Sequence, residues 1–463
     1  MKRILLVQLS LLFSYGLFSQ GVGIGTANPV EKLQVVGNIK ADTLKPNALK
    51  ITLNAGEGKL LTSDATGNAR WQELLSTSNT AGTVGFGSWG DCSTNNISEY
   101  NPVIDTLPAK NDVFGNSIAQ SGNFAIIGAN KGYADIFRFN GSNWVFMQKL
   151  VQPGNTTGTA FGFAVAISDS IAIVGAPFDS VGSVVQGTAF IYKFNGITWS
   201  LLQKISDPGG AANDFFGGFV SVSGNNIIVG SSSDDVGTNV DQGSASTFHF
   251  TGTSWVFVQK LTDVAGTGND QFGITSLSGN FAVIGAPFAK IGANAGQGFA
   301  NIYQFNGASW IFMKRLFDST AAPTNGFGIK VSISGNFAMV GAPGNIVNAK
   351  GSVLLFRFDG SNWNFFQKIS DPITPGSNFG NSVAISGDYA LAGTPNVSSG
   401  GYAVLYSLLG LEWSPYQTIT DPHGRATNSF GNAVSIDGIN KRFMIAAPAY
   451  GLNSGKVVFG KVN

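Results

Sequence analysis

One short pattern recurs seven times along this chain. A Phe-Gly pair returns every 47 to 56 residues, and it is followed by a Ser- and Gly-rich stretch and then by an apolar phrase such as "FAVIGAP". A regular period of this length is typical of proteins that stack one supersecondary unit on copies of itself. We therefore expect seven similar units. The pairs begin at Phe114, Phe161, Phe216, Phe272, Phe327, Phe379 and Phe430.

Each unit reads as four strands. Examples are "NSVAISG" from Asn381, "NFAVIGAP" from Asn280, "GTAFIYKFNG" from Gly187 and "TWSLLQKIS" from Thr198. Helix signals are almost absent, and 62 glycines together with only 11% charged residues suit short strands joined by tight turns. Four strands in each unit, repeated seven times, predict an all-β fold: a seven-bladed β-propeller of four-stranded antiparallel blades.

Two further residues recur at equivalent places in the units. Asn-Gly or Asp-Gly separates the third strand from the fourth, which predicts a two-residue type I′ turn. A tryptophan then opens the fourth strand in six units, and we expect it to pack between adjacent blades. A Lys or Arg five residues after most of these tryptophans predicts a solvated strand edge. These basic residues are Lys149, Lys204, Lys260, Arg315 and Lys368.

The seventh unit is incomplete. From Phe430 it has three strands and no tryptophan strand, and the chain then reaches Asn463. The stretch "SEYNPVIDTLPAKNDVFG" from Ser98 resembles the end of a complete unit. We therefore expect residues 100–107 to supply the outer strand of the last blade, so that a strand from before the first unit closes the ring.

The phrases "FGNSVAISGDYALAGTP" from Phe379 and "FGFAVAISDSIAIVGAP" from Phe161 resemble FG-GAP repeats. Such repeats build the seven-bladed propellers of integrin α chains and of many bacterial surface proteins. The resemblance covers residues 96–463. A Gln-Lys pair in the fourth strand, as at Gln203-Lys204, is more similar to the bacterial branch than to the integrin one.

The resemblance raises the question of calcium, which many FG-GAP blades hold in an Asp-x-Asp-x-Asp-Gly loop. Calcium takes six to eight oxygen ligands, so alternating carboxylates are expected in such a loop. The equivalent loops here, such as "FDSVGSVVQG" and "GNIVNAKG", lack those acids. The one remaining candidate set is Asp234, Asp235 and Asp241, with a solvated acidic loop as the alternative. We expect no cofactor and no metal.

The N-terminal part has its own organisation. Residues 1–20 have a charged start and a short apolar core, which predicts a signal peptide and hence a secreted or outer-surface protein of a Gram-negative bacterium. Residues 21–71 resemble a small β-rich module of exported proteins, in which trimerisation is one alternative. Residues 72–95 are rich in Gly, Ser and Thr and read as a linker to the propeller at 96–463. No later segment predicts a membrane span.

Loop lengths predict two unlike faces of the ring. The turns between strands one and two, and between strands three and four, are short and fall on one face. The other connections are longer and polar and fall on the opposite face, which we interpret as the binding surface. An aspartate recurs at the root of these long loops, at Asp207, Asp263, Asp318, Asp371 and Asp421. These carboxylates either contact a ligand or cap turns.

Function is predicted only in outline. The net charge of +1 and the scattered Lys and Arg do not favour a nucleic-acid partner. No catalytic motif is present, so the protein reads as an exported or cell-surface adhesion module that binds an extracellular protein or polysaccharide. The alternatives are a secreted glycan-processing enzyme with carboxylates in the channel, and a purely structural surface protein.

Overall fold

The computed structural model describes residues 112–462, except 155–156, 322, 345–350, 374–377, 396–399, 422–427 and 450–453. It also gives the backbone of five short strands before residue 112. The predicted signal peptide, the linker beyond Glu73 and the strand expected at 100–107 lie outside the described residues. The chain divides into two units, Met1–Leu74 and Leu75–Asn463.

The first unit contains two small sheets. Strand β1 (Val22–Ile24) pairs in parallel with β2 (Leu33–Val35), and β3 (Lys59–Ser63) forms an antiparallel hairpin with β4 (Ala69–Glu73).

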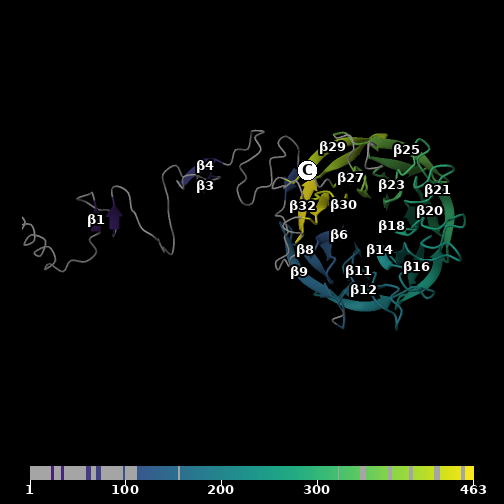
Figure 1. Cartoon of the computed structure of the whole chain (residues 1–463). Coiled ribbons are helices and arrows are strands. Elements are labelled where there is room, and N and C mark those ends of the chain that lie inside the picture. The colour runs from purple at the N-terminus through teal and green to yellow at the C-terminus, as the bar shows by residue number, and fades with distance from the viewer. Residues whose placement is uncertain are drawn as a thin grey trace, which may run out of the picture. The chain divides into compact units, whose positions relative to one another are not determined.

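The second unit is a seven-bladed β-propeller, and the described residues include no helix (Figure 1). Blades I to VII, in chain order, are β6 (Phe114–Ser121), β7 (Phe124–Ala129), β8 (Tyr133–Phe139) and β9 (Trp144–Val151); β10 (Val165–Ser168), β11 (Ile171–Ala176), β12 (Thr188–Phe194) and β13 (Trp199–Ile205); β14 (Phe216–Ser223), β15 (Asn226–Ser231), β16 (Ser244–Phe250) and β17 (Trp255–Leu261); β18 (Ile274–Ser278), β19 (Phe281–Ala286), β20 (Phe299–Phe305) and β21 (Trp310–Leu316); β22 (Lys330–Ser334), β23 (Phe337–Ala342), β24 (Ser352–Phe358) and β25 (Trp363–Ser370); β26 (Ser382–Ser386), β27 (Tyr389–Thr394), β28 (Tyr402–Leu409) and β29 (Glu412–Thr420); and β30 (Ala433–Asp437), β31 (Arg442–Ala447), β32 (Lys456–Val462) and β5 (Ile97–Glu99).

The first strand of each blade lies nearest the axis, and the fourth strand forms the outer rim (Figure 1). Each first strand contacts the first strand of the next blade, and the series closes where β30 meets β6. Serine hydroxyls join these inner strands: Ser221 Oγ accepts a hydrogen bond from the Leu277 N–H at 2.9 Å, and Ser276 Oγ accepts one from Ile333 at 3.2 Å. The ring is therefore continuous at its centre.

The last blade is closed from the N-terminal side, as the sequence predicts. Strand β5 pairs antiparallel with β32, with Ser98 opposite Lys461 and Ile97 opposite Val462. The closing strand is Ile97–Glu99, which precedes the range expected from the sequence. The residues that pair are set by the register with β32, whereas the resemblance to other outer strands indicated residues 100–107.

The tryptophans pack between blades, as predicted. All six side chains are 0 to 8% exposed. The Trp199 ring of blade II meets Phe124 of blade I edge to face, with centroids 5.3 Å apart. The glutamine of the Gln-Lys pair holds the same junction, because Gln148 Nε2 donates to the Trp199 carbonyl at 2.8 Å and Gln148 Oε1 accepts from the Trp199 N–H at 2.9 Å.

The turns on the face with short connections are of two kinds. Strands one and two are joined by two residues, as at Gly122-Asn123, where Gly122 has φ +56° and Asn123 is not in the positive range. This pattern is that of a type II′ turn. The predicted type I′ turns between strands three and four are wrong: Phe139 pairs with Trp144, which leaves four residues, and only Gly141 has positive φ. The Asn140 side chain accepts two backbone hydrogen bonds across that loop, which stabilises the longer form.

The repeated glycines meet at the junctions between blades. A Cβ placed on Gly230, in the second strand of blade III, would lie 1.8 Å from the Gly273 carbonyl oxygen of blade IV. The same contact recurs between Gly175 and Gly217 at 1.9 Å. The glycine of "Gly-Ala-Pro" and the glycine of "Phe-Gly" thus recur together because neither side of this junction has room for a side chain.

We expect Gly230→Ala to destabilise the propeller by about 2–3 kcal/mol, because two backbones would have to separate in a packed core. Gly209→Ala is the matched control, since its Cβ would meet no atom within 4 Å and its φ is not positive. Urea unfolding measures both variants. Similar midpoints for the two would contradict this explanation of the repeated glycine.

Candidate binding surface on the long-loop face

The five aspartates predicted as ligand contacts lie where the fourth strands end on the long-loop face. Three of them cap the turn that follows. Asp207 Oδ1 accepts from the Gly209 N–H at 3.1 Å, Asp318 Oδ1 from Thr320 at 2.9 Å and Asp371 Oδ1 from Ile373 at 2.9 Å. Their side chains are almost entirely buried. This is the turn-capping geometry that the sequence left as an alternative.

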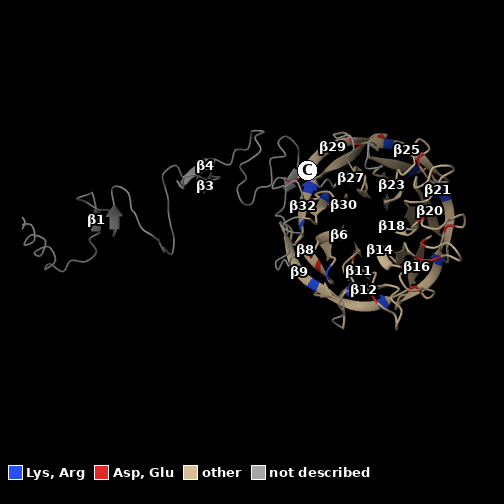
Figure 2. Cartoon of the chain, viewed as in Figure 1, with Lys and Arg blue, Asp and Glu red and all other residues tan. Residues whose placement is uncertain are grey.

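Four of the five aspartates bind a basic residue of the next blade, and the fifth, Asp371, binds a tyrosine there. Lys260 Nζ lies 2.8 Å from Asp207 Oδ2, and Lys368 Nζ lies 2.7 Å from Asp318 Oδ2. Arg315 pairs with Asp263, Lys456 pairs with Asp421, and the Tyr402 hydroxyl donates to Asp371. The predicted solvated edge at the basic residues is therefore wrong for Lys260, Arg315 and Lys368, which join adjacent blades. Figure 2 shows the charged residues spread around the ring. Contact of these aspartates with a ligand stays a prediction.

Burial and ion pairing act in opposite directions on the pKa values of these carboxylates, and the net shift differs between them. Burial tends to raise the pKa of Asp318, but hydrogen bonds from Lys368 and Thr320 outweigh it, so the pKa is lowered. Burial also raises the pKa of Asp263, and the neighbouring Arg315 offsets this only in part. The pKa of the buried carboxylate is therefore raised at one junction between blades and lowered at another.

Two carboxylates share one lysine at the junction of blades II and III, and a third carboxyl group lies beside them. Lys260 Nζ lies 2.8 Å from Asp207 Oδ2 and 2.5 Å from Asp234 Oδ2, and Asp214 is buried beside them. Burial raises the pKa of Asp214 to about 6, and the charges of Asp234 and Asp207 add to this effect.

We expect the contribution of Asp214 to the free energy of unfolding to fall as pH rises from 4 to 6, because the folded state retains a proton on Asp214 that the unfolded state releases near pH 3.8. Asp214→Asn should remove about 1–3 kcal/mol of this dependence, since the amide stays neutral and its oxygen can still accept from the Ala211 N–H. Urea unfolding of both proteins at pH 4 and pH 7 measures the difference. Parallel pH profiles would show that Asp214 ionises normally.

The candidate calcium ligands do not converge. Asp234 is buried against Lys260, whereas Asp235 Oδ1 accepts the Asp241 N–H at 2.9 Å within its own loop. In the part of the chain that the structure describes, no group of three or more His, Cys, Asp or Glu side chains is arranged to hold a metal ion.

The loops between the second and third strands of blades II, III and IV share one construction. Each contains a small hairpin, with bridges at Val181–Val184, Val236–Asn239 and Ile291–Asn294. In blade III, Gln242 Nε2 donates to the Asp263 carbonyl at 2.7 Å, and Asn239 Nδ2 donates to Gln242 Oε1 at 2.7 Å. Asn294 and Gln297 repeat these bonds in blade IV. The loops of blades III and IV are thus braced against the connection that leaves the same blade, and in blade II the Asn213 N–H donates to the Val185 carbonyl at 2.7 Å in the same role.

These braced loops expose apolar side chains. Phe178 in blade II and Phe288 in blade IV are each 50% exposed, and Val240 in blade III is 57% exposed. Phe178 also meets Phe215 edge to face, with centroids 5.4 Å apart. The loop lengths in the sequence favour this face as the binding surface, but these residues do not stand out there. Phe178 and Phe288 share one signal, a phenylalanine directly after "Gly-Ala-Pro", whereas Val240 directly follows Asn239 of the small hairpin in its loop.

The repeated part of the chain matches a known protein family. A family profile described as FG-GAP repeat matches residues 144–192, 199–248, 255–302 and 310–356. Each match begins at a blade tryptophan and ends in the third strand of the next blade, and the complete ring has seven such blades. The chain is an FG-GAP repeat β-propeller protein. Each family repeat thus starts with the fourth strand of one blade and continues into the first three strands of the next. Because of this one-strand shift, the fourth strand of blade VII has to come from β5.

Solved structures support the fold of this FG-GAP protein. A chain from "Crystal Structure of Mitotic Checkpoint Complex" is 12% identical, with a TM-score of 0.51, over 82% of this chain and 99% of that chain. In all, 773 solved chains match, so the ring by itself does not define a function. No curated protein matches the chain. Within the described residues, no helix is long and apolar enough to span a membrane.

Proposed function

We propose that this FG-GAP protein is an exported or cell-surface adhesion module that recognises a protein or a polysaccharide through the long-loop face and catalyses no reaction. One observation carries the proposal: three braced loops hold Phe178, Val240 and Phe288 exposed at the same face. Exposed apolar groups that cluster on a soluble protein mark interaction sites. Loops that are already ordered lose little conformational entropy on binding. Of the two ligand classes, the apolar tips favour a protein.

Export rests on the pattern of residues 1–20, from which we infer that the protein lies outside the cell or on the outer surface of a Gram-negative bacterium. N-terminal sequencing of the protein recovered from the culture medium and from the outer-membrane fraction tests this part. A mature N-terminus near residue 20 is expected, and an intact Met1 would contradict export.

The binding proposal is tested on an array of purified cell-surface proteins and polysaccharides. We expect saturable binding by the full chain, and at least tenfold weaker binding by the triple variant Phe178→Ser, Val240→Ser and Phe288→Ser. Ile197→Ser is the matched control, because this apolar residue is 79% exposed in a turn on the opposite face. The control should bind as the unchanged chain does.

Other outcomes separate the alternatives. Equal binding by the triple variant would exclude the long-loop face as the site. Turnover of a polysaccharide on the array would favour the glycan-processing enzyme, and absence of binding to every array member would favour a purely structural role.

A further inference from the structure

On the short-turn face, each junction between blades is usually filled by the first residue of the second strand. Phe124 of blade I lies against Phe194 and Trp199 of blade II, with ring centroids 4.8 and 5.3 Å apart. Phe281 of blade IV repeats this arrangement against Phe358 and Trp363 of blade V, at 5.0 and 5.4 Å. An aromatic ring at this place therefore closes the junction.

Two junctions have a polar residue there instead. Arg442 takes the place between blades VII and I, with its guanidinium carbon 3.8 Å from the centroid of the Phe139 ring. Asn226 takes it between blades III and IV, where its Oδ1 lies 2.9 Å from His249 Nδ1. Both junctions contain a cavity, of about 1200 Å³ beside Arg442 and about 460 Å³ beside Asn226. Each of these cavities thus lies at a junction where a polar residue stands in place of an aromatic ring.

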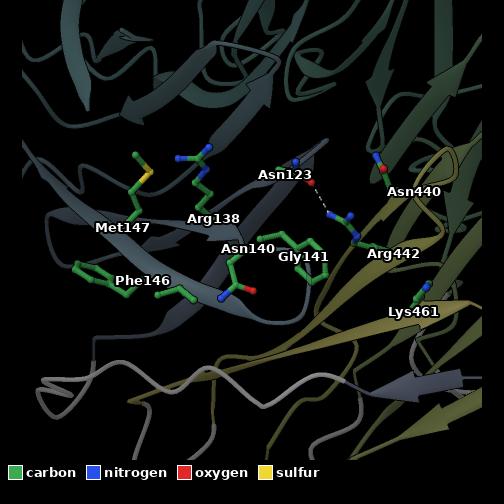
Figure 3. Close-up of a pocket in the computed structure, with 11 residues that line it drawn as sticks. Asn123, Arg138, Asn140, Gly141, Phe146, Met147, Asn440, Arg442 and Lys461 are labelled. Atoms are coloured by element: carbon green, nitrogen blue, oxygen red, sulfur yellow. Dashed lines mark hydrogen bonds between the residues drawn. The ribbon is translucent and has the colours of Figure 1, made fainter. Parts of the chain in front are cut away.

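The larger cavity is basic. Arg138, Arg442 and Lys461 line it, and none of its described lining residues is acidic. Figure 3 shows Arg138 on one side and Arg442 with Lys461 on the other. Arg442 Nη1 donates to Asn123 Oδ1 at 3.1 Å. Within the described residues, neither Arg138 nor Lys461 forms an ion pair with a carboxylate. Two positive charges therefore face the cavity without an ion pair to any carboxylate of the described residues.

The remaining lining residues add hydrogen-bonding groups and an aromatic surface. Asn123 and Asn140 contribute amides, and Phe146 is 42% exposed at the rim (Figure 3). Asp437 is the carboxylate of the adjoining turn, and it already accepts the Gly122 N–H at 3.0 Å and the Asn440 amide at 2.8 Å. These hydrogen bonds hold the Asp437 carboxylate within the turn, and Asp437 is not among the described residues that line the cavity.

We propose that this cavity is a second binding site, for a carboxylate-bearing sugar of an acidic polysaccharide. Arg138 and Lys461 bind the carboxylate, because guanidinium and ammonium groups form strong charge-assisted hydrogen bonds with it. The Asn amides bind the ring hydroxyls, and Phe146 offers a flat apolar face to the sugar ring. Ligand pockets usually occupy about 300–1,000 Å³, so this cavity has room for more than one sugar unit.

The test is isothermal titration calorimetry of the full chain with a trimer of a uronic acid. We expect saturable binding at one site, which weakens as the salt concentration rises. The double variant Arg138→Gln and Lys461→Gln should bind at least tenfold more weakly. Lys193→Gln is the matched control, because Lys193 occupies the place of Arg138 in blade II, opposite Ile171, and lines neither cavity. It should bind normally.

A second variant tests the cavity itself. Arg442→Phe restores the aromatic ring found in blades I, IV and V, so it should abolish binding while the melting temperature is retained. Absence of uronate binding, or equal binding of the neutral methyl-ester trimer, would overturn the proposal. Inorganic phosphate or sulfate that binds as tightly as the uronate would show a general anion site and would overturn the sugar assignment.

This site lies on the face opposite the braced loops, so the two proposals fail independently. The triple variant in the long loops should retain uronate binding, and Arg442→Phe should retain binding to a ligand of the long-loop face.

Discussion

Deletion of residues 96–107, which removes β5, is expected to lower the free energy of unfolding of the propeller by about 4 kcal/mol or more. The deletion leaves β32 as an unpaired edge with Val462 and Phe459 beside it, both completely buried in the intact ring. Ladder hydrogen bonds contribute about 1 kcal/mol each, and the apolar area exposed at the rim adds to this loss. An open edge also invites pairing with another chain. Thermal and urea unfolding of the truncated protein measure the effect.

Removal of residues 21–74 is the control for this deletion, because they form a separate unit. The propeller without them should melt within about 2 °C of the full chain. Equal melting of the 96–107 deletion and the full chain would show that β5 does not close the ring.

A gain of stability offers a complementary test in a Cys92→Ser background. Cysteines in place of Ser98 and Lys461 lie opposite each other in the register, so oxidation should join them and raise the melting temperature. Failure of this disulfide to form, measured by mass spectrometry, would contradict the register.

The second large effect is expected at the ion pair between blades VI and VII. Lys456 Nζ lies 2.7 Å from Asp421 Oδ1, and the two side chains are only 2% and 1% exposed. Lys456→Met should lower the free energy of unfolding by about 3–5 kcal/mol, because it removes the buried lysine charge that lies against the buried Asp421 carboxylate. The double variant with Asp421→Asn should recover at least half of that loss.

The control for this cycle is Lys204→Met. Its partner Asp179 lies 2.7 Å away, but the Lys204 side chain is 42% exposed, and solvent weakens such pairs to about 1 kcal/mol or less. Equal losses for Lys456→Met and Lys204→Met would show that burial does not decide the strength of these pairs.

The blade count and the direction of closure were predictable because both depend on the repeat itself. Seven Phe-Gly pairs and a last unit without its tryptophan strand already indicate a ring that borrows a strand. The position of β5 was not predictable, since three residues carry little pattern and their pairing depends on β32. The four-residue loop at Asn140 depends on side-chain hydrogen bonds that the Asn-Gly pair alone does not reveal.

The roles of the repeated charged residues depended on contacts between units. Asp207 and Lys260 are separated by 53 positions in the sequence, and each alone suggests a turn cap or an exposed edge. Their pairing becomes visible only when blade III packs on blade II. The basic cavity was missed for the same reason, because Arg138 of blade I and Lys461 of blade VII meet only after the ring has closed.

The closure of blade VII has a mechanical consequence. A pulling force applied through the residues before Ile97 acts directly on β5 and passes to β32 through their shared ladder. If the molecule is anchored through its N-terminal residues and binds a target through blades II to IV, tension passes around the ring to the β5–β32 pair. The force needed to separate β5 from β32 then sets the tension at which the propeller of an anchored molecule opens.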